Sequence, residues 1–124
     1  MSTPVVADKY RGKKEYFLAY SALVAAAHSR SLLTYAGIAH LTGLPTRGQD
    51  MANKVGHLVG EISEDEHNAG RPLLSALVVY KGDGTPSFGF YKLARKLGML
   101  AGSSKSAEKA FTNKEQTNLF EFWK

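Results

Sequence analysis

The sequence segment that most constrains the fold is GRPLLSALVVYKGDGTPSFGF, residues 70–90, which combines the most apolar run of the chain with its densest group of glycines and prolines. The run LLSALVVY over residues 73–80 is partly β-branched and does not alternate strictly, which predicts a strand buried on both faces. Asp83 and Gly84 form a dipeptide typical of hairpin turns, and SFGF then follows as the returning strand. We therefore expect a small β-hairpin in this part of the chain.

Helical patterns account for most of the remaining sequence. Residues 12–29 are rich in alanine and lack internal glycine or proline, which predicts a helix. A short helix follows, with Thr34 as its N-terminal cap and Gly43 as its end, and a longer helix is expected over residues 47–63. Together these last two predict a helix-turn-helix. The first helix is expected to face the core with Phe17, Tyr20, Leu23, Val24 and Ala27.

The C-terminal third is also expected to be helical. YKLARKLG, residues 91–98, predicts a helix that Gly98 closes, and the tail predicts one or two more, ending in an aromatic helix over residues 114–124. The length of the chain favours a single domain spanning residues 1–124, with residues 1–10 as a flexible arm. The expected anchors of the tail are Phe111, Leu119, Phe122 and Trp123.

The helix expected over residues 47–63 has two contrasting faces. Met51, Val55, Leu58 and Ile62 fall on one narrow stripe, which predicts the buried side. The opposite face is short, polar and flat, and its two glycines cost helix stability of about 1 kcal/mol each relative to alanine. Such a face suits close approach to a large surface, and asparagine or glutamine can pair with adenine in a major groove. Alternatively, the glycines allow another helix to pack tightly. The residues of this flat face are Gln49, Asn53, Gly56 and Gly60.

The charge of the chain favours a polyanionic partner. The formal net charge is +5 and the sequence pI is near 9.5. Basic residues gather near both termini, whereas EISEDEH, residues 61–67, concentrates acidic ones and is expected to be a solvated helix end on a face turned away from the anion. Many equally basic proteins bind no nucleic acid, so the charge alone leaves both interpretations open.

Several functional classes are disfavoured by the composition. No run of about 18 apolar residues occurs, so no membrane partner is expected. The start MSTPVVADKYRGKK does not resemble a signal peptide. The absence of cysteine excludes disulfides, thiol nucleophiles and cysteine-ligated zinc, and permits the reducing cytoplasm that we expect as the location.

Enzymatic chemistry has no positive support in the sequence. Ser75 lacks the small-residue elbow that exposes a nucleophilic serine, and a serine within an apolar strand usually bonds a neighbouring backbone group. No metal site or cofactor is expected either. The four histidines belong to no nucleophile or metal-binding motif, and they are His28, His40, His57 and His67.

The order helix-turn-helix, strand, hairpin and helix resembles a winged-helix module, and three segments resemble one family in particular. LLTYAGIAHLTGLP is similar to the TYGEIAxxxGxP segment of the alkylguanine-DNA alkyltransferases and alkyltransferase-like proteins. NKVGHLVGEI resembles the recognition-helix segment of that family, and RPLLSALVVYKGDG resembles its PxxPCHRVVxxxG segment. The resemblance covers about residues 31–85. The GRPLLSALVV block and the terminal FEFW also resemble small bacterial and phage proteins whose aromatic tail continues further, which implies that this chain ends early.

The resemblance can be carried over residue by residue. Tyr35 matches the tyrosine that lies at the DNA backbone and helps rotate a nucleotide out of the stack. Asn53 stands where the family has the arginine that fills the vacated space, which weakens the implication of nucleotide flipping. Ser75, Ala76 and Leu77 replace the reactive cysteine, its histidine neighbour and the next arginine. Without the thiolate and the histidine, alkyl transfer is excluded and the DNA-binding scaffold remains.

We therefore expect an α+β, mainly α fold: a winged helix-turn-helix with a small β-hairpin and extra N- and C-terminal helices. The expected function is non-enzymatic binding of double-stranded DNA, with residues 47–63 in the major groove and a wing near residues 80–88. The alternative is a protein-interaction module, a phage or mobile-element factor that binds a nuclease or a defence complex. The expected DNA-binding residues are Tyr35, Arg47, Gln49, Asn53, Lys54, Gly56, His57 and Lys81.

Overall fold

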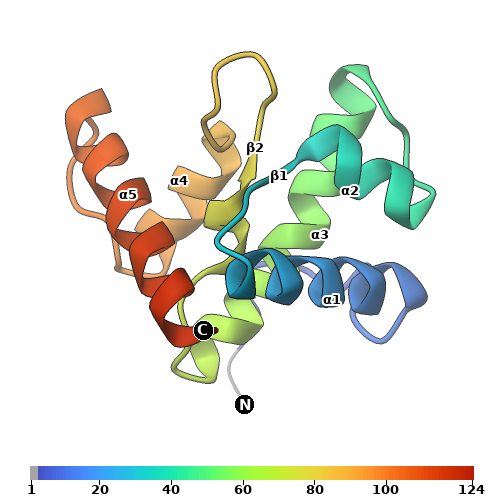
Figure 1. Ribbon diagram of the computed structural model, residues 1–124, viewed down its shortest axis with the longest axis horizontal. Helices are drawn as coiled ribbons and strands as arrows, with labels where there is room; N and C mark the ends of the chain where they lie inside the picture. The colour runs from blue at the N-terminus through green and yellow to red at the C-terminus, as the bar shows by residue number, and fades with distance from the viewer. Residues whose placement is uncertain (1–2) are drawn as a thin grey trace.

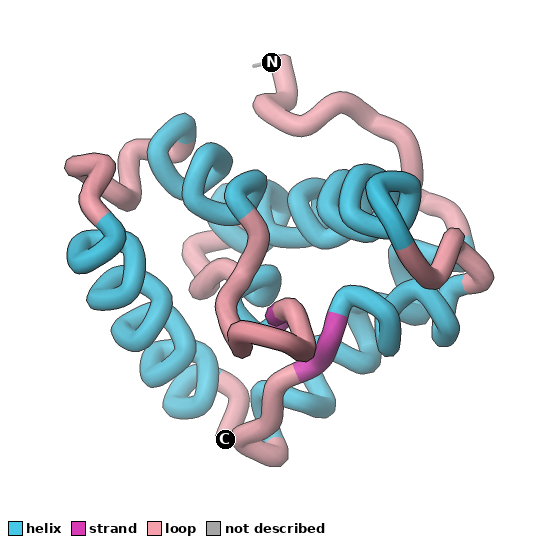
Figure 2. The backbone as a smooth tube through the Cα atoms, turned by 90° about the horizontal axis from the view of Figure 1, so that it is seen from above, coloured by secondary structure: helices cyan, strands magenta, loops and turns pink. Residues whose placement is uncertain are grey.

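The structure is a computed structural model that describes residues 3–124. The fold is α+β and mainly α, as the sequence predicts. Figures 1 and 2 show helices around two short strands, with α4 and α5 on one side of the strands and α2 and α3 on the other. The elements in chain order are α1 (Lys14–His28), β1 (Leu33–Thr34), α2 (Tyr35–Thr42), α3 (Gly48–Asn68), the 3-10 helix η1 (Leu74–Leu77), β2 (Val78–Val79), α4 (Phe88–Lys96) and α5 (Lys105–Phe122).

The two strands form a parallel pair, so the prediction of a β-hairpin over residues 73–90 is wrong. Leu33 pairs with Val78 and Thr34 with Val79. Half of the predicted strand forms η1 instead, and SFGF leads into α4 rather than forming a returning strand. Residues 73–79 are all buried. A short apolar run that is buried on every side carries no periodicity by which a strand can be told from a helix.

The loop at residues 80–87 keeps the tight turn of the expected hairpin without its second strand. Gly84 N donates to Tyr80 O at 2.8 Å, and Tyr80 N donates to Thr85 O at 2.9 Å. The Asp83 carboxylate accepts from the N–H and the hydroxyl of Thr85 at 2.9 and 2.7 Å. These contacts close the loop on itself, so it projects from the end of β2 as a separate feature (Figure 1).

Local capping contacts set both ends of α2 as predicted. Thr34 Oγ1 accepts from Gly37 N at 3.0 Å at the start of α2, and Gly43 ends this helix in the left-handed conformation with φ of 79°. α1 lies within the predicted range, but its buried face is rotated, because Phe17 is 59% exposed. Small side chains let α1 pack closely on its neighbours. The buried residues of α1 are Ala19, Leu23, Ala26 and Ala27.

α3 is the longest helix of the described residues, and it contacts α1, α2, α4 and η1. It continues more than a turn beyond its predicted end at Ser63 and includes the whole acidic segment. The predicted apolar stripe is confirmed, with the remaining core side chains of η1 and β2 packed against it. In this stripe Val55, Leu58 and Ile62 are fully buried and Met51 is partly buried.

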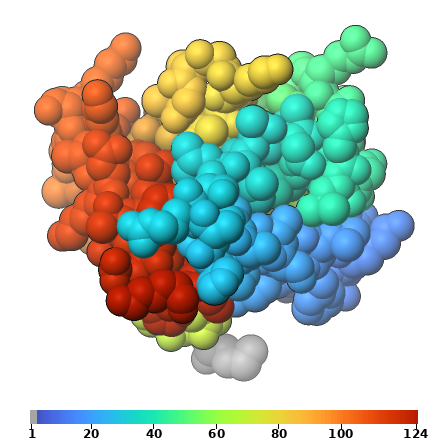
Figure 3. Space-filling view, in the orientation of Figure 1, coloured from blue at the N-terminus to red at the C-terminus, as the bar shows by residue number. Residues whose placement is uncertain are grey.

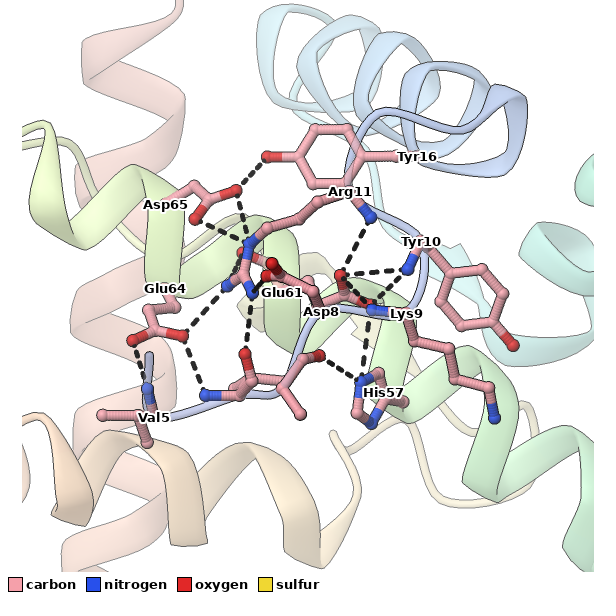
Figure 4. A network of polar contacts seen from close by, with 12 residues as sticks. Val5, Asp8, Lys9, Tyr10, Arg11, Tyr16, His57, Glu61, Glu64 and Asp65 are labelled. Carbon is pink, nitrogen blue, oxygen red and sulfur yellow. Dashed lines mark hydrogen bonds and ion pairs between the residues drawn. The ribbon is translucent and has the colours of Figure 1, made fainter. Parts of the chain in front are cut away.

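The acidic segment of α3 is buried, so the prediction of a solvated helix end is wrong. Glu61, Glu64 and Glu66 have exposed fractions of 0%, 3% and 1%. A buried carboxylate requires hydrogen-bond donors in place of water. Figure 4 shows that main-chain N–H groups of the N-terminal arm supply them to Glu61 and Glu64. Glu66 instead pairs with both Nε and Nη2 of Arg71, at 2.8 and 2.9 Å.

The described part of the N-terminal arm is therefore bound to α3, in contrast to the flexible arm predicted for residues 1–10; residues 1–2 lie outside the described residues. Glu64 accepts from the N–H groups of Val5 and Val6 at 2.6 and 2.8 Å. Glu61 accepts from the N–H groups of Lys9, Tyr10 and Arg11 at 3.0 to 3.1 Å. Two side chains of one helix thus bind the main chain of this segment, which bends around them.

Arg11 completes this contact. Its guanidinium donates to Asp8 at 2.6 Å, to Glu64 at 2.9 Å and to both oxygens of Asp65 at 3.1 Å. Tyr16 of α1 donates its hydroxyl proton to Asp65 at 2.7 Å, and burial together with this bond raises the pKa of Tyr16. The arm, α1 and α3 are therefore joined through one network (Figure 4).

The C-terminal tail forms one helix, α5, which is longer than the aromatic helix predicted over residues 114–124. Leu119 is buried as expected, but Phe122 is 50% exposed and is not an anchor. Two polar side chains fix α5 to the centre of the fold. Glu115 accepts from Leu73 N at 2.9 Å, and Gln116 donates to Ala76 O at 2.9 Å.

Candidate nucleic-acid interface

A groove of about 440 Å³ lies between the outer face of α3 and the start of α4. The flat face of α3 forms one wall. A Cβ atom added at Gly56 would meet nothing within 4 Å, and one added at Gly60 would meet only Val6 of the arm, at 3.7 Å. The described residues thus place no helix against these glycines. The other walls include Tyr35, Tyr80, Ser87, Phe88, Phe90 and Lys92.

The first two turns of α3 present the predicted polar side chains to solvent. Gln49 and Asn53 are exposed one turn apart, and Gln49 Nε2 donates to Asn53 Oδ1 at 2.9 Å. This bond orders both amides. Within the described residues, Gln49 Oε1 and Asn53 Nδ2 have no other partner and can bond a ligand. Arg47 is exposed at the N-cap position of α3, and Lys54 is half-buried on the next turn. The N-terminal end of α3 is therefore polar and accessible, with Arg47 and Lys54 outnumbering its one exposed carboxylate, Asp50.

Tyr35 is not a surface residue, in contrast to its predicted position against a DNA backbone. Its exposed fraction is 2%, and its ring packs on Tyr80 with centroids 4.6 Å apart. The hydroxyl oxygen accepts from Ser87 N at 2.9 Å. Burial raises the pKa of Tyr35, and the bond from Ser87 offsets part of that rise. Tyr35 therefore forms part of the groove wall and links α2 to the start of α4.

His57 is also engaged by the fold rather than left free for DNA. Its Nε2 lies 2.8 Å from Ala7 O and 3.4 Å from Glu61 Oε2. The arm thus lies against the third turn of α3 and leaves the two turns before it open. Lys81, in contrast, is exposed in the loop at residues 80–87, as predicted for a wing residue.

Ser75 is a buried structural residue. Its exposed fraction is 2%, and it exchanges two hydrogen bonds with Ser63 of α3. Ser63 Oγ donates to Ser75 Oγ at 2.6 Å, and Ser75 N donates to Ser63 Oγ at 2.9 Å. These bonds join η1 to α3, and the Ser75 hydroxyl bonds a side chain of α3 rather than the neighbouring backbone group that was predicted.

Carboxylates and basic side chains differ in how many have partners within the fold. Most carboxylates have partners inside it: Arg11 holds three, Arg71 and Arg95 hold Glu66 and Glu108, and main-chain N–H groups bind Glu61 and Glu115. Within residues 3–124, most lysines make no ion pair. The free cations at the candidate interface are Arg47, Lys54, Lys81 and Lys92.

Two features of the groove were not predicted from the sequence. Phe88 is 74% exposed at the groove margin, because it begins α4 instead of lying in a strand. Ser87 precedes this helix and places its N–H on Tyr35. A serine directly before a run with helical spacing is an N-cap signal, which could have indicated that α4 begins here.

Comparisons of the chain with protein-family models, curated proteins and solved structures find no match. The resemblance to the alkyltransferase family therefore stays a prediction from the residues. Among residues 3–124, none of the helices is long and apolar enough to cross a membrane.

Proposed function

We propose that the protein is a non-enzymatic DNA-binding protein of winged-helix type, related in plan to the alkyltransferase-like proteins. α2 and α3 act as the helix-turn-helix, and the first two turns of α3 enter the major groove. Asn53 and Gln49 contact base edges there, while Arg47 and Lys54 contact phosphates. The loop at residues 80–87 acts as the wing through Lys81.

The observation that carries this proposal is the separation of charge along α3. At its start Arg47 and Lys54 are free cations on either side of one exposed carboxylate, Asp50, whereas its last turns carry carboxylates that are buried against the arm and Arg71. In Figures 1 and 3 the start of α3 (green) and the loop at residues 80–87 (yellow) lie along the same upper edge of the molecule. A polyanion approaching this edge meets Arg47 and Lys81, and the positive end of the helix dipole adds to their attraction.

The resemblance places Ser75 where alkyl transfer would need a cysteine, and the burial of Ser75 against Ser63 supports a structural role for this position. Binding alone is therefore the proposed activity.

The proposal is tested by fluorescence anisotropy of a labelled DNA duplex over a salt series. We expect binding at about 50 mM salt that weakens steeply as salt rises. Asn53→Ala should weaken binding about tenfold for preferred sequences, because one base contact is worth about 1–3 kcal/mol. Asn68→Ala makes the same change at an exposed residue at the C-terminal end of α3, and it should leave binding unchanged.

Two results would contradict the proposal. The first is the absence of duplex binding at about 50 mM salt, where even non-specific DNA-binding proteins bind. The second is equal weakening by Asn53→Ala and Asn68→Ala, which would exclude the proposed orientation of α3. Binding of a protein partner with little salt dependence would instead support the interaction-module alternative.

A further inference from the structure

A second groove, about 570 Å³ in volume, lies between the loop at residues 80–87 and the N-terminal half of α5. The loop contributes residues 83–86, and α5 contributes Lys105, Lys109 and Asn113 among others. In Figure 3 the loop (yellow) and the start of α5 (orange) lie next to each other along the upper edge that also carries the start of α3. The groove thus continues the candidate interface on the far side of the loop.

The α5 wall of this groove is positively charged. Lys105 and Lys109 are four residues apart, so both lie on one face of α5, and both are exposed. Neither makes an ion pair within the described residues. The N-terminus of α5 adds the partial positive charge of the helix dipole at the same place.

The acidic side chains of the groove oppose this charge only weakly. Glu108 is held by Arg95, whose Nη2 donates to it at 2.6 Å. The Asp83 carboxylate is turned back onto Thr85, whose N–H and hydroxyl lower its pKa. Asp83 therefore remains charged, and it lines the same groove from the loop side.

The groove is also rigidly held. Gln116 donates to Ala76 O at 2.9 Å, which fixes α5 to η1, and Thr112 donates to Tyr91 of α4 at 3.1 Å. Lys105 and Lys109 are therefore presented from a fixed helix at a set position relative to the loop. The backbone of this wall is therefore already ordered before a ligand binds.

From this arrangement we propose that the DNA duplex bound at α3 continues across the loop, and that its phosphate backbone occupies the groove beside α5. Lys105 and Lys109 contact consecutive phosphates there, and the loop is contacted from both sides. This inference rests on the proposed function. The charge of the groove matches a phosphodiester backbone, whose contacts give affinity and register without reading sequence.

The test compares two double variants with the same loss of charge. Lys105→Gln with Lys109→Gln changes the α5 wall, while Lys13→Gln with Lys14→Gln changes two exposed lysines at the start of α1. All four side chains are exposed, so both variants are expected to fold, and circular dichroism is used to check this. Duplex binding by each is measured by anisotropy between about 50 and 200 mM salt.

We expect the α5 variant to lower the slope of log K against log salt by about 1.8, since each lost phosphate contact removes about 0.9. Over a fourfold change in salt, wild type then loses about 12-fold more affinity than the α5 variant. The α1 variant should keep the wild-type slope. Asp83→Asn, which keeps an acceptor for Thr85, should strengthen binding.

The outcomes separate this inference from the proposed function. If wild type binds no duplex, the proposed function itself is wrong. If wild type binds and the α5 variant keeps the full slope, the DNA does not reach α5, and the α3 interface stands alone. Equal loss of slope in both double variants would also overturn the inference, because it would reflect net charge rather than a groove.

Discussion

Replacing Glu61 by glutamine would remove one negative charge from the contact between α3 and the N-terminal arm while keeping the size of the side chain. Glu61 is fully buried and accepts from three consecutive main-chain N–H groups at 3.0 to 3.1 Å. Glutamine keeps one acceptor oxygen. Its amide group, however, turns a second acceptor into a donor that faces Tyr10 N at about the position of Oε2.

The size of the effect follows from these bonds. A hydrogen bond to a charged group contributes about 1.5–3 kcal/mol, and one between neutral groups about 0.5–1.5 kcal/mol. Weakening the bonds from three N–H groups to Oε1 by about 1 kcal/mol each gives a loss of about 3 kcal/mol in the free energy of unfolding. For a chain of this length, that loss lowers Tm by about 12 °C, at about 4 °C per kcal/mol.

The assay has a global and a local readout. Tm is measured by circular dichroism, and opening of the arm is measured as the rate at which trypsin cleaves after Lys9 and Arg11 under native conditions. When opening is fast relative to cleavage, the rate follows the population of the open form. A loss of about 3 kcal/mol should then raise this rate on the order of 100-fold.

Glu121→Gln is the matched control, because it makes the same chemical change at an exposed ion pair with Lys124. Exposed ion pairs of this kind add little to stability, so its Tm and arm cleavage should stay close to wild type. The proposed role of Glu61 is refuted if Glu61→Gln keeps a Tm within about 2 °C of wild type. A lower Tm with unchanged cleavage of the arm would show that Glu61 stabilises the core rather than holding the arm.

Three further predictions concern other parts of the fold. Burial alone would raise the pKa of Glu64, but bonds from the N–H groups of Val6 and Val5 and from Arg11 lower it. The stabilisation by the charged Glu64 is therefore complete above the ordinary glutamate pKa of about 4.3 and is lost as pH falls through the lowered pKa. Urea unfolding between about pH 3 and pH 6, roughly one to two units on either side of that pKa, should show a smaller loss of stability at low pH for Glu64→Gln than for wild type. Gly43→Ala should cost about 1–2 kcal/mol, measured by urea unfolding, because φ of 79° is strained for alanine. Ser63→Ala should cost about 1–3 kcal/mol in the same assay, because Ser75 N loses its buried acceptor; a cost below 0.5 kcal/mol, less than about half the usual hydrogen-bond value, would contradict this.

The parts of the fold that depend on local chemistry could be predicted from the sequence. Thr34 caps α2 through a bond to the N–H three residues later, and Gly43 ends it through a backbone conformation that glycine favours. The stripe that includes Leu58 and Ile62 is buried because helical geometry places these residues on one side. None of these features requires knowledge of a distant segment.

The acidic half of α3 could not be predicted, because its partners lie far away in the chain. The N–H of Tyr10 that binds Glu61 is 51 residues away, and Arg11 is 53 residues from Glu64. From local pattern alone, EISEDEH indicates a solvated helix end. Only the path of the arm across α3 supplies donors that make burial favourable.

The candidate site was likewise predictable only where local helical periodicity determines exposure. Gln49 and Asn53 are exposed, as helical periodicity predicts, because they lie opposite the buried stripe. Tyr35 and His57 are not available to DNA in this structure, because α4 and the arm cover them. Those two contacts depend on where α4 begins and on the position of the arm, neither of which follows from periodicity.

The buried carboxylates and the basic edge are two results of one distribution of charge. The arm and the end of α3 bring Asp8, Glu61, Glu64 and Asp65 around a single arginine. Because these carboxylates are bound at one end of α3, they add little field at the other end, where Arg47 and Lys54 lie on either side of Asp50. A net charge of +5 therefore understates the attraction of a polyanion to that end. Releasing the arm would expose the carboxylates, so the contact that stabilises the fold should also favour DNA binding.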